Sequence, residues 1–133
     1  MSDKERIARE RDWVKARFEC TVDSVFQELV SVVDSDVKSF NKLSGRNACE
    51  IKRVEDRKTT VALAERVAFV STDGKVIRAG ILHGRSSLSD FEIRAEWNEA
   101  DLHCDLFIEG EKVSMHRASQ KIIGSVLFPR GHS

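Results

Sequence analysis

The first forty-odd residues contain neither proline nor glycine before Gly45, and apolar side chains recur through them at a helical spacing. Steps of eleven residues, from Ile7 to Phe18 and from Phe18 to Leu29, correspond to about 3.67 residues per turn, the period of a nearly straight helix. The pattern predicts a helical segment over residues 1–44, ended by Gly45. The apolar stripe comprises Ile7, Val14, Phe18, Val22, Val25, Leu29, Val33, Val37 and Phe40.

The length of this stripe constrains what can cover it. Forty residues of unbroken helix are about 60 Å long, roughly twice the width of a small domain. Either the helix breaks, at 20–23 or 34–36 where residues that can cap a new helix occur, or a second copy of the chain covers the excess. Of the two alternatives the sequence favours the homodimer, with Trp13 as a contact anchor. The expected interface residues are Ile7, Trp13, Val14, Phe18, Val25 and Leu29.

From Ala48 the apolar period changes to two, which predicts an antiparallel meander over residues 48–115. Five or six strands are expected, near 49–55, 60–70, 75–83, 90–97, 102–109 and 111–115. Asp73–Gly74 is the strongest hairpin signal, residues 109–112 are a weaker one, and 83–90 is the longest predicted loop. The helical period returns over 116–128. The chain is therefore expected to be a single α+β domain over 1–133, with its C-terminal helix packed on the sheet.

Cysteine usage and hydropathy bear on location. Cys20, Cys49 and Cys104 are odd in number and form no C-x-x-C pair, which favours free thiols and a reducing compartment. The first residues are densely charged, and no apolar run is long enough to span a bilayer. These features predict a cytoplasmic protein without a membrane partner.

Charge is uneven in a chain whose net charge is zero. Residues 89–111 hold eight acidic and one basic side chain, a net charge of −7. This segment predicts an acidic surface that could bind a basic protein, or the basic region 37–88 of a second copy, and it argues against nucleic acid as a partner. Its acidic residues are Asp90, Glu92, Glu96, Glu99, Asp101, Asp105, Glu109 and Glu111.

The triplet His103–Cys104–Asp105 raises the question of catalysis. If Asn98–Asp101 is a turn, Ala95 pairs with Cys104, Arg94 with Asp105 and Glu96 with His103, so Cys104 faces inward while His103 and Asp105 form a charged outer ladder. An enzyme using His103 and Asp105, or His83, is the less favoured alternative. His83, His103, Cys104 and His116 show no convergent metal spacing, and no phosphate-binding motif occurs, so neither a metal nor a cofactor is expected.

The sequence thus favours a non-enzymatic, homodimeric protein-interaction module. The alternative from another class is a small-molecule binder with an apolar pocket between sheet and helices. The candidate pocket residues are Phe69, Arg78, Leu82, His83, Phe91 and Trp97.

Overall fold

The computed structural model describes residues 12–45, 48–83 and 86–128, and within β4 and β5 it leaves the side chains of 83–89 undescribed. Two N-terminal helices, α2 (Trp13–Glu19) and α3 (Val22–Ser44), precede seven strands and a final helix, α4 (Met115–Leu127). The α+β class is confirmed. No described helix is long and apolar enough to cross a membrane.

The N-terminal helix breaks at one of the two predicted positions. Cys20 ends α2, and Thr21 caps α3 by accepting a hydrogen bond from the Ser24 backbone N–H at 3.2 Å. The other position does not break, because α3 runs through Asp34 and Asp36 to Gly45, whose φ of 74° closes it. The break follows from the local capping residue.

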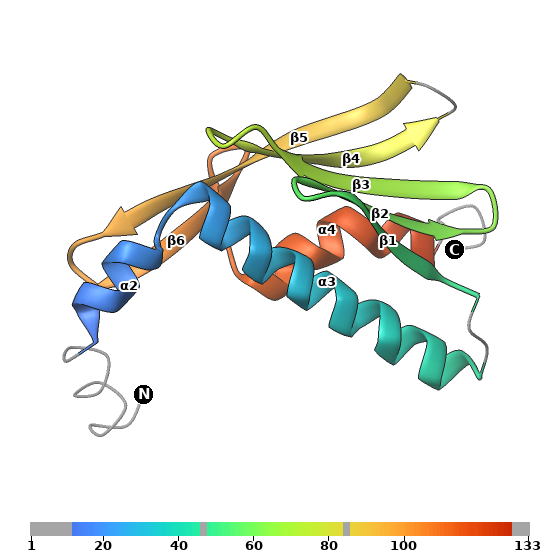
Figure 1. Cartoon of the computed structure of the whole chain (residues 1–133), viewed down its shortest axis with the longest axis horizontal. Helices are drawn as coiled ribbons and strands as arrows, with labels where there is room; N and C mark the ends of the chain where they lie inside the picture. The colour runs from blue at the N-terminus through green and yellow to red at the C-terminus, as the bar shows by residue number, and fades with distance from the viewer. Residues whose placement is uncertain (1–11, 46–47, 84–85, 129–133) are drawn as a thin grey trace.

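The sheet is a seven-stranded antiparallel meander in which each strand pairs with its neighbour in sequence (Figure 1). Seven strands replace the predicted five or six because the stretch expected at 60–70 folds as two strands, turning at Ala64 with a φ of 56°. Alanine carries no turn signal, so the sequence did not show this hairpin. The strands are β1 (Glu50–Glu55), β2 (Lys58–Leu63), β3 (Arg66–Thr72), β4 (Ile77–His83), β5 (Ser86–Asn98), β6 (His103–Ile108) and β7 (Glu111–Val113).

Two other local predictions need correction. The loop expected at 83–90 is largely strand, because β5 begins at Ser86 and pairs with β4 from His83 onward. The weaker of the two hairpin signals, at 109–112, forms the tight two-residue turn: Glu109 and Gly110 both have positive φ, at 53° and 81°. At Asp73–Gly74 the chain does turn, but over four residues and with only Gly74 at positive φ.

Helices α3 and α4 lie side by side and cover one face of the curved sheet (Figure 1). The apolar stripe of α3 is buried against this face, with Leu29 and Val33 fully inaccessible to solvent. From α4, Ala118, Ile122 and Val126 complete the core. At the end of α3, the Asn41 side chain exchanges two hydrogen bonds with the backbone of Cys49, which fixes the passage from helix to sheet. The core therefore lies between one helix pair and one sheet face, and α2 is outside it.

Candidate functional site

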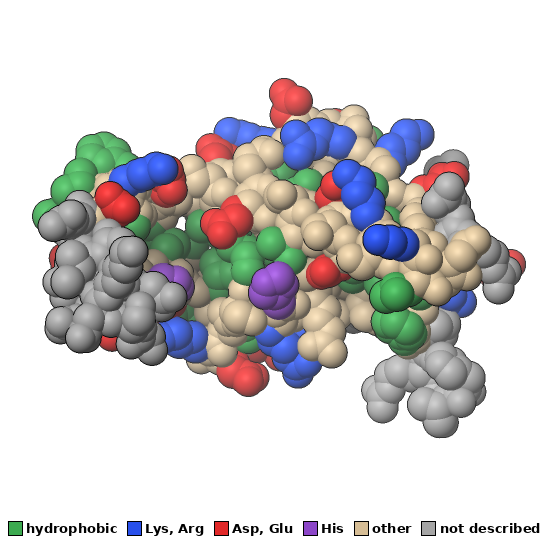
Figure 2. Space-filling view, turned by 90° about the horizontal axis from the view of Figure 1, so that it is seen from below, with side chains coloured by type: hydrophobic (Ala, Val, Ile, Leu, Met, Phe, Trp, Pro, Cys, Tyr) green, Lys and Arg blue, Asp and Glu red, His purple; other side chains and the backbone are tan. Residues whose placement is uncertain are grey.

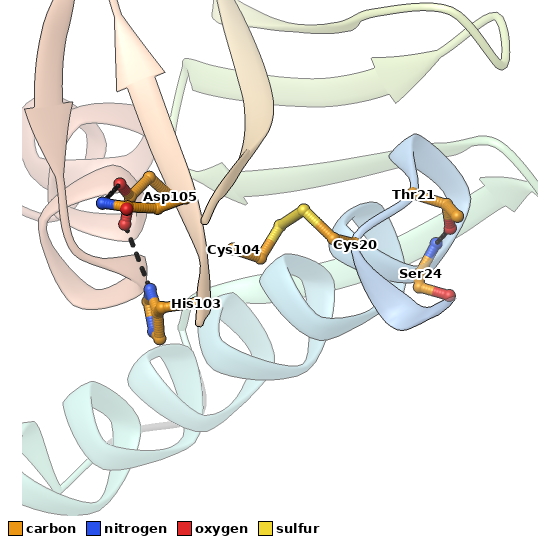
Figure 3. Close-up of a disulfide and its surroundings, with 7 residues drawn as sticks. Cys20, Thr21, Ser24, His103, Cys104 and Asp105 are labelled. Carbon is orange, nitrogen blue, oxygen red and sulfur yellow. Dashed lines mark hydrogen bonds and ion pairs between the residues drawn. A yellow bond between two sulfur atoms is a disulfide. The ribbon is translucent and has the colours of Figure 1, made fainter. Parts of the chain in front are cut away.

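A disulfide joins the end of α2 to the start of β6 (Figure 3). Cys20 and Cys104 are bonded across a sequence separation of 84 residues, with their Cα atoms 5.4 Å apart. This corrects the expectation of three free thiols; Cys49 is free and buried, and desolvation followed by the nearby Glu50 carboxylate raises the pKa of its thiol. It also corrects the expected packing of Cys104 against Ala95, because Cys104 lies opposite Trp97 and its sulfur is bonded to Cys20.

Helix α2 presents large apolar side chains to solvent. Trp13 is 44% exposed, Val14 47% and Phe18 77%, and no residue of the helix is buried. Besides the disulfide, α2 contacts the sheet through Arg17, whose guanidinium lies 5.4 Å from the centre of the Trp97 ring. A seven-residue helix is marginal in water by itself, so its attachment to β6 by the disulfide is what positions these apolar side chains.

The residues expected at a dimer interface divide into three groups. Trp13, Val14 and Phe18 form the exposed face of α2. Val25 and Leu29, at 3% and 0% exposure, belong to the core of their own chain, so a partner cannot reach them. Ile7 lies outside the described residues. The helix break separates the first group from the second.

A recess of about 350 Å³ opens beside α2, and Figure 2 shows the helix-bearing face hollowed there. Its floor is apolar, from Val25, Leu106 and Val113, and three titratable side chains stand around it: Glu19, Glu28 and His103. The sequence did not predict this recess, because it forms where the disulfide joins the end of α2 to β6, beside the start of α3.

The buried carboxylate of Asp105 organises the outer face of β6. It accepts hydrogen bonds from Asn98 Nδ2 at 2.9 Å and from His103 Nδ1 at 3.1 Å, and Lys112 Nζ lies 3.4 Å away. Burial alone raises the pKa of the Asp105 carboxyl, but these hydrogen bonds and the lysine charge outweigh it and hold the pKa below its usual value. Because the ionised carboxylate only accepts, the Nδ1 of a neutral His103 carries the proton.

This cluster corrects the predicted charged ladder. His103 and Asp105 do share the outer face, but Asp105 stands opposite Glu96, and Arg94 stands opposite Phe107. The register is shifted by two residues because Leu102, counted as strand, adopts a φ of 52° and belongs to the turn. A histidine oriented by a buried carboxylate has the arrangement of a general base, but Cys104, the adjacent candidate nucleophile, is consumed by the disulfide.

The predicted acidic surface is only partly available to a partner. Asp105 is buried within its cluster, and Glu92 is engaged by Arg78 at 2.9 Å and by Arg94 at 3.0 Å. Trp97 Nε1 donates to Glu99 at 2.9 Å, and Asn98 Nδ2 donates to Asp101 at 3.2 Å. The acidic residues that remain exposed are Asp90, Glu96, Glu99, Asp101, Glu109 and Glu111.

The residues expected to line a ligand pocket are not brought together. Phe69 stands opposite Gly80, and Arg78 opposite Glu92, on the outer face of the sheet, to which strand alternation also assigns Leu82. Phe91 packs against the core on the inner face, and Trp97, at an alternate position of the same strand, shares that face. The side chain of His83 lies outside the described residues. Within the described part of the chain, no three His, Cys, Asp or Glu side chains gather as a metal site would require.

A groove of about 1220 Å³ lies between the C-terminal half of α3 and the length of α4. Phe40, Ile123 and Phe128 supply apolar lining, and the Phe40 and Phe128 rings meet edge to face with centroids 5.7 Å apart. Leu43, at 87% exposure, and Phe128, at 64%, stand at its border. Sequence reasoning missed this groove, because it forms only where α3 and α4 lie side by side.

Comparisons with protein-family models, with curated proteins and with solved structures found no match for the chain.

Proposed function

We propose that this chain is a protein-interaction module that associates with a second copy of itself through the exposed apolar face of α2. The observation that carries the proposal is the exposure of Trp13, Val14 and Phe18 on a helix that buries none of its own residues. Exposed apolar side chains that gather in one place are typical of interaction surfaces. Tryptophan, the residue type of Trp13, is enriched among the few interface residues that contribute most of the binding energy.

The charges favour a second copy as the partner. The chain has a net charge of zero, so two copies do not repel each other at long range. Lys15 and Glu19 stand one turn apart on α2, with their charged atoms 3.9 Å apart and both side chains well exposed. A helix that carries both signs can meet an identical helix, or another mixed surface, without unpaired like charges.

The exposed acids of residues 90–111 supply a second surface within the same proposal. They suit a basic protein partner, and such binding weakens as salt rises.

A cytoplasmic location is a separate prediction, since the disulfide removes the free-thiol argument for it. Alkylation of thiols in intact cells, followed by mass measurement, decides it: a free Cys20–Cys104 pair supports the cytoplasm, and a bonded pair places the chain in an oxidising compartment.

Sedimentation velocity over a hundredfold concentration range tests association directly. The wild-type chain should change from monomer to dimer, and Val14→Ser with Phe18→Ser should raise the dissociation constant at least tenfold. Val54→Ser is the matched control, because Val54 is 50% exposed on β1, away from α2. A wild-type chain that stays monomeric throughout would contradict the proposal.

A further inference from the structure

We infer that the surface receiving α2 is the groove between α3 and α4 of the second copy, and that two copies exchange this contact reciprocally. The inference rests on the proposed self-association and identifies its second surface. The apolar ridge, defined as Trp13, Val14 and Phe18, is convex, whereas the α3–α4 groove is concave and apolar. The same chain thus carries both halves of one complementary contact.

Area argues against the simpler pairing of α2 with α2. Seven residues of helix extend only about 10 Å, and a stable interface needs to bury roughly 1,000 Å² or more. Two such short helices crossing each other cannot supply that area. A ridge lying in a groove is covered on three sides, and a reciprocal pair contains two such contacts.

The size and shape of the groove favour a chain segment over a small molecule. Its volume of about 1220 Å³ exceeds the ~300–1,000 Å³ of ordinary ligand pockets. It lies open between two helices, so a third helix can lie across it. Gly124 in α4 adds to this openness, because a Cβ atom placed there would have Gln120 Cγ, at 3.8 Å, as its nearest neighbour beyond the helix backbone.

The groove carries a charge opposite in sign to each member of the Lys15–Glu19 pair of α2. Arg117 and Lys121 line it from α4, and Asp36 lines it from α3. Glu19 of α2 is opposite in charge to the first two, and Lys15 is opposite in charge to Asp36. Asp36 already accepts a hydrogen bond from Ser119 at 2.6 Å, which fixes its position at the groove.

The placement of the two surfaces permits a closed pair. Helix α2 lies at one end of the molecule, and the C-terminal ends of α3 and α4 lie at the other (Figure 1). Hydrophobic side chains gather at both ends of the face seen in Figure 2. A two-fold axis through that face brings the ridge of each copy to the groove of the other, and a two-fold axis closes the assembly at two chains.

A mixing experiment with two surface variants tests the inference. The ridge variant is Val14→Ser with Phe18→Ser, and the groove variant is Leu43→Ser with Phe128→Ser; all four side chains are at least 47% exposed. We expect each variant alone to have a dissociation constant at least tenfold above that of the wild type. An equimolar mixture should associate more tightly than either variant alone, because the intact ridge of one fits the intact groove of the other.

A second variant fills the groove without removing apolar surface. Gly124→Met should also weaken association at least tenfold, and His116→Met, on an exposed position of the same helix outside the groove, should leave it unchanged. Circular dichroism melting of every variant verifies that the monomer is folded.

Each outcome has a distinct meaning. Groove variants that associate like the wild type, while the ridge variant does not, overturn the inference and leave self-association through α2 intact. A wild-type mass that grows beyond two chains overturns the reciprocal arrangement. A wild-type chain that is monomeric at every concentration refutes the proposed function itself.

Discussion

Helices α2 and α3 are consecutive parts of one apolar stripe, yet they have opposite environments. Six residues of α3 are buried, including Val25, Leu29 and Val33, whereas α2 buries none and leaves Phe18 77% exposed. The 23 residues of α3 span about 35 Å, and its buried residues extend from Val25 to Val37, whereas Leu43 near its end is 87% exposed. Periodicity therefore indicates that a face is apolar, but the extent of the sheet decides which part of that face becomes core.

Leu29→Ala should give the largest loss of stability, because it truncates a fully buried side chain of α3. We expect the free energy of unfolding to fall by about 2–5 kcal/mol, measured by urea denaturation. Leu43→Ala, the same substitution in the same helix at 87% exposure, should change it by less than about 0.5 kcal/mol. Similar losses from both would show that α3 is not covered as described.

Cys20→Ser should give the next largest loss of stability, because it removes the disulfide that attaches α2 to β6. The expected loss in the free energy of unfolding is about 2–4 kcal/mol, by chemical denaturation under oxidising conditions. Cys104→Ser and the double variant should show the same loss, since all three break one bond. Trypsin cleavage at Lys15 and Arg17 should become faster in each. Unchanged cleavage would mean that α2 is held by contacts other than the disulfide.

Thr21→Ala tests the boundary between the two helices. Its side chain caps α3 through the Ser24 N–H, so its loss should reduce the free energy of unfolding by about 1 kcal/mol in thermal or urea denaturation. Thr21→Ser keeps the capping oxygen and should restore most of the loss. If alanine proved neutral, the break would have another cause than the local cap.

Phe18→Ala should have the smallest effect on the monomer, despite removing a larger side chain than Leu29→Ala does. At 77% exposure it should alter the free energy of unfolding by less than about 0.5 kcal/mol at concentrations below dimerisation. The same substitution should weaken self-association in sedimentation. A loss above about 1.5 kcal/mol in the dilute monomer would show that α2 is packed against its own chain.

The fold was predictable wherever alternation or capping residues determined it. Gly45, the possible break at 20–23 and the faces of β5 and β6 are all visible in the sequence, and a register error of two residues preserved those faces because side chains alternate with period two. The turns at Ala64 and Leu102 were not predictable, because alanine and leucine rarely adopt positive φ.

The candidate site was less predictable than the fold. Cysteines 84 residues apart carry no local signal of pairing, and only their meeting in space, where the end of α2 reaches β6, brings them together. Asp105 was assigned correctly to the outer face, but its burial depends on Asn98 and Lys112 from neighbouring strands. The groove required two helices to be placed side by side, which periodicity within each helix cannot specify.

The Cys20–Cys104 bond also bears on the order in which a single chain folds. It closes residues 20–104 into a ring that contains α3 and the first five strands. Helix α2 precedes the ring, and most of β6, with β7 and α4, follows it. Every strand pairs with its sequence neighbour, so the hairpins are local contacts, whereas pairing of the two cysteines must close a loop across 84 residues. We therefore expect the oxidation of this pair to follow the formation of the hairpins.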